Sequence, residues 1–532
     1  MKSGRAIKSN GNPLPIGYGL VFILTLAPIL LFFLSTLTET SPQKTEWIFL
    51  AVPTGRRFVL LLNTIVLALS VAGVTVLAAW AVALCAWMYA PRVASWLLLG
   101  VIPLVVVPPY IHALTWLSLD QLAGRLLGRW GFWGGVPSGM ASTIWVEWAA
   151  YTPLAFGCLL LGLRAIDPDL LDAARLSRSD ISVLFRTVLP LTSPAFLTAG
   201  GIIFLFSLLD YGIPSLLQIH VYALEIFADF NATENVTGAL GLAIPLLCIG
   251  AGSLALLLEP ILTFAFQQSR GSLVWVNPPS VPVWFNRTVG FLTGAVLFQA
   301  ALPLVVMVKM SPRLKDFSTI VAQAMPDILY SLKISTTAGL ICLPAAAVIG
   351  RALLQPSPWR KGAWFVLLLP LALPSSLVGI MLIQLTKYWP ASRAFLPVWV
   401  NVFRFLPLAV LLVTAHLRTV DPLLLESAMV FQPSWRRRLF FINLPLASPG
   451  LLAGLGCVVS LAMGELAATL LVVPPGSSTL ILRIYNYLHF GASQTVASLC
   501  LTLSLTVLLA SGVMTLVVLW WSKIARSSEA LR

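Results

Sequence analysis

The sequence predicts an all-α, polytopic membrane protein with about twelve transmembrane helices in two pseudo-symmetric halves. Hydrophobic residues make up 58% of the 532 positions, charged residues only 10%, and the mean hydropathy is +0.93. A soluble domain carries about 25% charged residues. This chain therefore cannot cover itself with polar surface, and lipid must be its solvent. The second basis for the prediction is an internal repeat, described below.

Twelve apolar runs are long enough to cross a membrane, which takes about 20 residues. They occupy roughly 17–36, 60–89, 94–116, 139–163, 191–217, 237–265, 289–309, 328–353, 363–386, 397–418, 448–473 and 493–521. The first run is too long for the apolar part of a signal peptide and lacks a small-residue cleavage site, so we interpret it as a membrane anchor.

The basic residues predict which loops face the cytoplasm. With the N-terminus placed inside, the inner loops carry about twice as many Lys and Arg residues as the outer loops. Both termini are then cytoplasmic, and the two longest inner loops, near 164–190 and 419–447, are the most basic. The net charge of +14 fits contact with anionic lipid headgroups. We expect no nucleic-acid partner, because no soluble region is large enough for a reader domain.

A polar, Pro-rich segment lies in the middle of the chain. Residues 266–288 read FQQSRGSLVWVNPPSVPVWFNRT, which is typical of a linker. We expect a cytoplasmic linker here, between a first half of six spans (1–265) and a second half of six spans (289–532).

The loops after the fourth and tenth spans repeat each other. One reads LRAIDPDLLDAARLSRSDISVLFRTVLPLTSPAF from Leu163, and the other reads LRTVDPLLLESAMVFQPSWRRRLFFINLPLASPGL from Leu417. Both share Leu-Arg-x-x-Asp-Pro, an acid followed by small residues, a basic stretch and Leu-Pro-Leu. Apolar runs match by chance easily, but a polar loop framed in this way does not.

Each repeated loop predicts a helix–turn–helix in the cytoplasm. Asp167-Pro168 and Asp421-Pro422 supply an N-cap acid followed by Pro in the first turn. The helices are expected to span 170–176 and 423–430. Second helices should begin near Ser179 and Ser434, and Leu-Pro should mark the start of the next span. A short helix that carries small residues outside the bilayer is suited to docking in a groove of another protein.

This loop resembles the EAA loop of type I ATP-binding-cassette (ABC) transporter permeases, in which Glu-Ala-Ala is followed by Gly and then by Leu-Pro. In that family the loop forms a coupling helix that fits a cleft on the ATP-hydrolysing subunit. The resemblance covers both halves, nearly the whole chain. It implies these ATPase contacts: Asp172, Ala173, Ala174, Ser177, Glu426, Ser427, Ala428 and Gln432.

Two departures from the family pattern accompany the resemblance. The first copy has Asp172 in place of Glu and is one residue shorter. The glycine of the family is Ser177 in one copy and Gln432 in the other. The loss of both glycines bears on the geometry of the turn and on the choice of ATPase.

A second resemblance concerns the segments FSLLDYGIPSLL, from Phe206, and SLAMGELAATLLVVPPG, from Ser460. They are similar to segments of the fused permeases of ferric-iron and thiamine importers. This implies an importer in the bacterial inner membrane, with two copies of an ABC ATPase and a periplasmic or lipid-anchored substrate-binding protein. We expect iron(III) or a thiamine-like solute, although very similar segments occur in permeases for polyamines and phosphonates.

Ionisable groups inside spans are costly and point to function. Five stand out: Glu147, Asp210, Lys333, Arg404 and Glu465. Asp210 and Glu465 occupy matching positions, about 30 Å along a helix from Leu-Pro, and are our candidate pathway residues. The alternative is that each is a structural acid, hydrogen-bonded to backbone or paired with Arg404 or Lys333. Glu147 is replaced by Asn401 in the second half, so symmetry does not support it.

Several kinds of site are absent from the sequence. The six cysteines lie singly in apolar runs and the four histidines are scattered, so we expect no metal site. No GxxxxGK[ST] loop occurs, so the chain should hold no cofactor, with ATP and Mg bound by the partner ATPase. The alternatives are a secondary transporter of the major-facilitator type and an integral-membrane enzyme. The paired loops argue against the first, and the absence of large loops and of GxSxG or HExxH motifs argues against the second.

Overall fold

The computed structural model describes residues 13–38, 46–89, 109, 111–117, 119, 139–267, 282–388, 390–432, 434–489 and 493–530. Within these ranges every regular element is a helix, which confirms the all-α class. Eight of the described helices are long and apolar enough to cross a membrane, or ten if each of two bent pairs counts as one span. The predicted third span, 94–116, lies mostly outside the described residues.

The first half follows the predicted order of spans. Its long helices are α1 (Pro13–Val21), which continues through the π-helix η1 (Phe22–Leu26) into α2 (Ala27–Thr38), then α4 (Arg56–Tyr89), α7 (Met140–Arg164), α11 (Ser193–Leu209) and α14 (Val236–Gln267). Its short helices are α3 (Glu46–Ala51), α8 (Pro168–Arg175), α9 (Asp180–Val183), η3 (Leu184–Val188), α10 (Leu189–Leu191), α12 (Gly212–Leu216) and α13 (Tyr222–Thr233).

The second half repeats this order. Its long helices are α15 (Val283–Met310), α16 (Leu314–Leu354), α19 (Leu396–Leu417), α22 (Leu444–Met463) and α25 (Ser493–Ala530). Its shorter helices are α17 (Arg360–Leu368), η4 (Leu369–Ala372), α18 (Ser375–Leu385), η5 (Pro390–Phe395), α20 (Pro422–Phe431), α21 (Trp435–Arg438), η6 (Leu439–Asn443), α23 (Ala467–Val472) and α24 (Leu480–His489).

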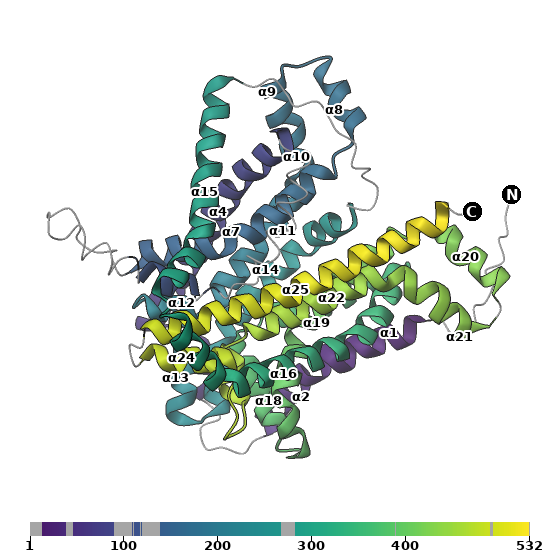
Figure 1. Cartoon of the computed structure of the whole chain (residues 1–532). Coiled ribbons are helices and arrows are strands. Elements are labelled where there is room, and N and C mark those ends of the chain that lie inside the picture. The colour runs from purple at the N-terminus through teal and green to yellow at the C-terminus, as the bar shows by residue number, and fades with distance from the viewer. Residues whose placement is uncertain are drawn as a thin grey trace.

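The two halves share one packing scheme. α4, α7 and α11 pack against one another in the first half, and α16, α19 and α22 do so in the second. The largest buried apolar cluster combines α4 and α7 with α18 residues such as Val378 and Met381, so the halves also share a core. Figure 1 shows two arms that diverge from a common base near α12 and α24, one ending at α8 and the other at α20.

The first helix of each half packs against the opposite half. α1 lies along α16 and α2 contacts α18, both of which belong to the second half. In the reverse direction, α15 packs against α4 and α7 of the first half. This exchange ties the halves together without a large polar interface.

Two predicted spans are shorter than expected, because their helices break at equivalent places. The run 191–217 is helical only to Leu209 before the chain restarts as α12, and the run 448–473 is helical to Met463 before α23. The breaks fall at Asp210 and Glu465, the two candidate pathway acids. A carboxylate beside a helix break can accept the N–H groups that the break leaves free.

The predicted span 363–386 is bent instead of straight. The helices before and after residue 373 meet at 102°, and Leu373 is extended, with φ −98° and ψ 135°. Pro374 explains the bend, because proline disfavours helical geometry in the residue before it and donates no backbone hydrogen bond.

The linker is shorter than the predicted 266–288. α14 continues to Gln267 and α15 begins at Val283, so both ends of the predicted linker are helical, and residues 268–281 lie outside the described part of the chain. Phe285 explains the early start of α15. Its ring is buried and packs edge-on against Phe185 of η3, with ring centroids 6.5 Å apart.

One close contact between helices occurs in both halves, but the small and the larger residue have exchanged helices. A Cβ added to Gly162 of α7 would lie 2.4 Å from the Cβ of Ala195 in α11. The equivalent contact joins His416 of α19 to Gly450 of α22, where an added Cβ would lie 2.7 Å from the His416 Cβ. The glycine has moved from one helix to the other, so each crossing keeps one partner without a side chain.

We predict that Gly450→Ala destabilises the protein by about 1–3 kcal/mol through overpacking. The double variant Gly450→Ala/His416→Gly should recover part of the loss, because it recreates the Gly162–Ala195 pair. Thermal unfolding in detergent measures both. Gly73→Ala on α4 is the matched control, since nothing lies within 4 Å of the added Cβ. Equal losses in the single and double variants would contradict the size-exchange account.

Candidate functional site

The first hairpin consists of α8 and α9 joined by a short turn. The Asp167 side chain accepts a hydrogen bond from the Asp169 backbone N–H at 3.0 Å, and Pro168 occupies the first turn. Arg175, at the end of α8, lies 3.6 Å from the Asp172 carboxylate and 3.7 Å from that of Asp180. The predicted capping is confirmed, and Arg175 links the helix before the turn to the helix after it.

The second hairpin is built in the same way from α20 and α21. The Asp421 side chain accepts a hydrogen bond from the Leu423 backbone N–H at 2.9 Å. The turn is closed by Arg438, whose guanidinium donates to the backbone carbonyl of Gln432 at 3.4 Å. Pro433 lies outside the described residues.

The described residues of the two turns include no left-handed residue. Gln432 has φ −126°, and Ser177 is not among the described non-glycine residues with positive φ. Glycine is required only where φ is positive. The loss of both family glycines is therefore compatible with the hairpin geometry of this chain.

The predicted contact residues differ in exposure. Asp172, Ala173, Ser177, Glu426 and Ser427 are exposed on the hairpins, and Gln432 is half-buried. Ala174 and Ala428 face inward, with Ala174 half-buried against the core and Ala428 only 6% exposed. The last small residue of each motif therefore anchors its helix to the protein instead of facing solvent, which a sequence repeat alone does not reveal.

The exposed apolar side chains at the ends of α8 and α20 were not predicted. Leu176 is 91% exposed beyond α8, and Val430 and Phe431 are 74% and 86% exposed at the end of α20. Large apolar groups are costly in water unless a partner covers them. The sequence does show apolar residues next to a polar turn. Whether their side chains point to solvent depends on the register of the helix, which the sequence does not give.

A π-helix follows each hairpin at an equivalent position. η3 and η6 each precede a Leu-Pro pair, Leu189-Pro190 and Leu444-Pro445. Proline clashes with the carbonyl four residues earlier in an α-helix, and a π turn changes the spacing at that point. In the second half one span runs from Arg436 to Met463 through Pro445, whereas the sequence predicted that it begins there. In the first half the helix Asp180–Leu191 meets α11 at 60°, so the straight part of that span does begin beside Leu189-Pro190.

At the other end of α11, the Asp210 carboxylate caps the restarted helix. Its oxygens accept backbone N–H groups from Gly212 at 2.9 Å and from Ile213 at 3.3 Å. Glu465 does the same after α22, accepting the Ala468 N–H at 3.0 Å. The two carboxylates also interact electrostatically with each other, so the matching acids lie in one region.

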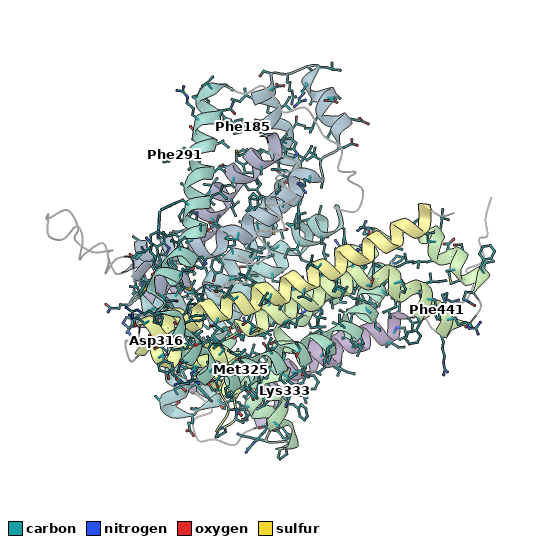
Figure 2. All side chains as sticks on the ribbon, in the orientation of Figure 1. Phe185, Phe291, Asp316, Met325, Lys333 and Phe441 are labelled. Atoms are coloured by element: carbon teal, nitrogen blue, oxygen red, sulfur yellow. The ribbon has the colours of Figure 1, made fainter. Side chains whose placement is uncertain are left out.

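Glu465 also forms an ion pair, whereas Asp210 forms none with the described residues. The Arg404 guanidinium on α19 donates to the Glu465 carboxylate and to the hydroxyl of Ser375, at the start of α18. The side chains of Arg404 and Glu465 are 19% and 9% exposed. Pairing with Arg404 is the alternative that the sequence left open. Lys333 takes no part, since it lies exposed on α16 (Figure 2).

Glu147 joins the same region, although symmetry did not support it. It is fully buried on α7, accepts a hydrogen bond from Ser207 of α11, and interacts electrostatically with Asp210. Its second carboxylate oxygen has no hydrogen-bond partner among the described residues. The first half thus contributes two acids, and the second half contributes one acid with its arginine.

Comparison with known proteins places the sequence in a family. Residues 342–526 match the family described as binding-protein-dependent transport system inner membrane component. The molybdenum transport system permease protein ModB of Haemophilus influenzae is 30% identical over 190 residues, which are 32% of this chain and 83% of ModB. The chain belongs to this family. The matched region of the permease includes α20, Arg404 and Glu465.

Other relatives of this permease differ in length. The putrescine transport system permease protein PotI of Escherichia coli is 25% identical over 31% of this chain and 64% of PotI. The putative ferric transport system permease protein FbpB 1 of Haemophilus influenzae is 24% identical over 63% of this chain and 56% of its own length. The chain thus spans less than two thirds of these relatives. The ferric match is too long for one half, in agreement with two fused permease halves.

The Arg404–Glu465 pair supports a double-mutant cycle. Arg404→Gln should lower the free energy of unfolding by about 3 kcal/mol, because removing one partner leaves a buried charge unpaired. Arg404→Gln/Glu465→Gln should lower it less, since no uncompensated charge remains. The exposed pair Arg56–Glu225 is the control, and Arg56→Gln should cost at most about 1 kcal/mol. Additive losses at Arg404 and Glu465 would show that the two side chains do not interact.

Proposed function

We propose that this chain is the permease subunit of an ABC importer in the bacterial inner membrane. It would carry a small solute through a path between its halves and hold no ATP site of its own. The observation that carries the proposal is the pair of symmetry-related hairpins. Each presents an exposed acid, Asp172 or Glu426, beside exposed apolar residues at the end of a short capped helix.

The number of hairpins suggests the composition of the complex. One ATPase copy per hairpin gives two copies per chain, which would bind ATP and Mg²⁺. The exposed acid can pair with a basic residue in a cleft, and the apolar end can enter its apolar floor. A periplasmic or lipid-anchored binding protein would deliver the solute at the opposite end, as the name of the family indicates.

The arrangement of the ends supports the proposed orientation. The start of α1, the end of α25 and the hairpin α20–α21 lie at the same end of the second arm in Figure 1. Arg436, Arg437 and Arg438 form α21. Basic residues favour the cytoplasmic side, so this end, and both termini with it, would face the cytoplasm.

The helices that follow each hairpin suggest how ATPase movement reaches the path. One span, made of α21, η6 and α22, leads from the second hairpin to Glu465. In the first half α9, η3 and α10 lead into α11 with a 60° bend, and α11 ends at Asp210. When the ATPases dimerise, the hairpins would approach each other and the two arms would rock about their shared base. The acids at the far ends of α11 and α22 would then change their separation.

The cluster of carboxyl groups leads us to test cationic solutes first. Glu147, Asp210 and Glu465 are three acids beside one arginine, and ionisable groups inside a membrane are expected to be functional. Iron(III) and a thiamine-like cation remain our proposed substrates. The names of the putrescine, ferric and molybdenum relatives widen the set, and uptake of labelled iron, thiamine, putrescine and molybdenum in cells that lack other importers would decide among them.

Purification in mild detergent, followed by mass spectrometry, tests the assignment. We expect an ATPase at two copies per chain, and any co-purifying binding protein would indicate the solute. Absence of an ATPase in several detergents and with ATP analogues would overturn the proposal and favour ion-driven transport by the chain alone.

We predict that Glu426→Arg abolishes transport and ATPase recovery while membrane insertion remains intact, because it reverses an exposed charge at the docking helix. Asp316→Arg is the matched control, because Asp316 is an equally exposed acid at the opposite end of the molecule (Figure 2). It should retain the ATPase. Normal uptake by the Glu426→Arg variant would contradict the proposal that this helix contacts the ATPase.

A further inference from the structure

An apolar groove runs between the first span and the second half. It has a volume of about 580 Å³. One wall is η1 and α2, with Leu24, Leu31 and Leu34, and the other is α18 and α19, with Leu382, Trp399 and Phe403. Leu31, Leu34 and Trp399 are partly exposed, so the groove opens on the outer surface of the protein, within the spans that face lipid.

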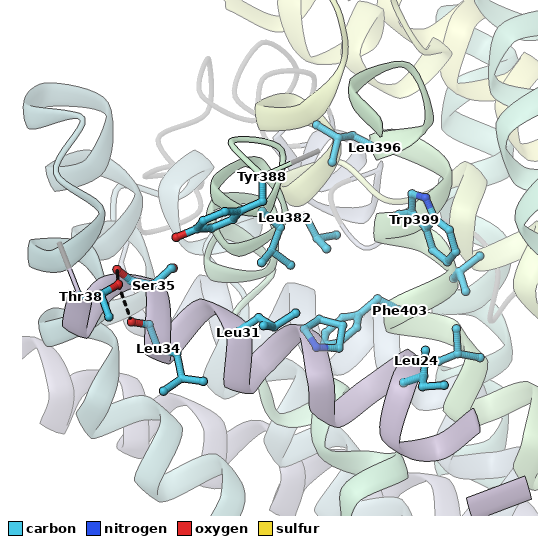
Figure 3. Close-up of a pocket in the computed structure, with 14 residues that line it drawn as sticks. Leu24, Leu31, Leu34, Ser35, Thr38, Leu382, Tyr388, Leu396, Trp399 and Phe403 are labelled. Atoms are coloured by element: carbon cyan, nitrogen blue, oxygen red, sulfur yellow. Dashed lines mark hydrogen bonds between the residues drawn. The ribbon is translucent and has the colours of Figure 1, made fainter. Parts of the chain in front are cut away.

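The polar groups of the groove gather at one end. Figure 3 shows Ser35, Thr38 and the hydroxyl of Tyr388 together at one end, while Leu24 and Phe403 lie toward the other. The Ser35 and Thr38 hydroxyls donate to backbone carbonyls of their own helix, and the Tyr388 side chain is exposed. The groove is therefore amphipathic along its length, as a lipid molecule is.

The size of the groove distinguishes between two occupants. An α-helix is about 10–12 Å across and rises 5.4 Å per turn, so each turn occupies roughly 400–600 Å³. The groove would hold little more than one turn of a partner helix. A single hydrocarbon chain is thin enough to lie along the whole groove between the two walls.

Charge at the polar end favours a phosphate-bearing lipid. Lys387 precedes Tyr388, and Arg393 follows it in η5; both side chains are exposed. Two exposed cations close in sequence to Tyr388 suit an anionic headgroup. Under the orientation proposed above, this end lies at the outer surface of the membrane.

We propose that this groove binds one phospholipid, with an acyl chain between α2 and α19 and the phosphate near Tyr388 and Lys387. The site is separate from the docking hairpins and does not depend on the transported solute. It does adjoin the charged cluster, because Phe403 lines the groove and the next residue, Arg404, pairs with Glu465. A bound chain would support the contact between the exchanged first span and the second half.

Native mass spectrometry of the full chain in detergent tests this proposal, with palmitoyl-oleoyl phosphatidylglycerol as the probe. We expect one tightly bound lipid per chain. Leu31→Trp should weaken its binding at least about tenfold, because the indole displaces two or so methylene groups at about 0.8 kcal/mol each. Leu340→Trp is the matched control, since Leu340 is an equally exposed leucine of α16 outside the groove, and it should bind lipid as the unmodified chain does.

Two further binding measurements identify the ligand. Inorganic phosphate should not compete with the lipid, because the acyl chain supplies most of the binding energy. Lys387→Gln/Arg393→Gln should weaken binding of phosphatidylglycerol, with the folded state checked by thermal unfolding. Equal lipid retention in the Leu31→Trp and Leu340→Trp variants would overturn the proposal. So would a stoichiometric membrane peptide that co-purifies with the chain and is lost on Leu31→Trp.

Discussion

In the membrane interior, a backbone N–H group has no water to bond to, and each break in a helix must be satisfied from within the protein. This constraint explains why Asp210 and Glu465 lie where they do. Each follows the last turn of a span and accepts N–H groups of the short helix that restarts beyond it. Because each carboxylate caps a restarted helix, it is held inside the protein, near the place where the two halves meet. A structural role and a role in a solute path are thus compatible for the same carboxylate.

The two halves are alike in backbone and unlike in chemistry. The helix triplets pack in the same way, the π-helices recur, and the breaks coincide. At the crossing of the fourth and fifth spans of each half, the glycine has moved from α7 to α22 while the close contact remains. In the charged cluster, Glu147 and Asp210 of one half have no basic counterpart, while Glu465 of the other is paired with Arg404. Fusing two halves in one chain allows each to change independently, and the charged cluster is accordingly asymmetric.

The two hairpins are held by the same kinds of interaction. Each has an N-cap acid, a small residue that packs inward and an arginine that bridges its turn. The apolar residues beyond them are exposed, and a π-helix and a Leu-Pro pair follow each hairpin. In the function proposed above, α11 and α22 would transmit movement of the hairpins to the acids at their far ends. The bent third span of the second half contributes to the same region, because Ser375 at the start of α18 binds Arg404.

The sequence by itself determined the class of protein, the repeat, the capped hairpins and the matching acids, because these depend on composition and on residues a few positions apart. Only the tertiary structure decided that Ala428 faces inward, that spans break at the acids, and that Glu147 belongs to the cluster. The decisive contacts join residues 60 and 61 positions apart, Ser207 with Glu147 and Arg404 with Glu465. Such contacts depend on the register and rotation of neighbouring helices. In spans that are apolar on most sides, no local pattern of residues encodes that rotation.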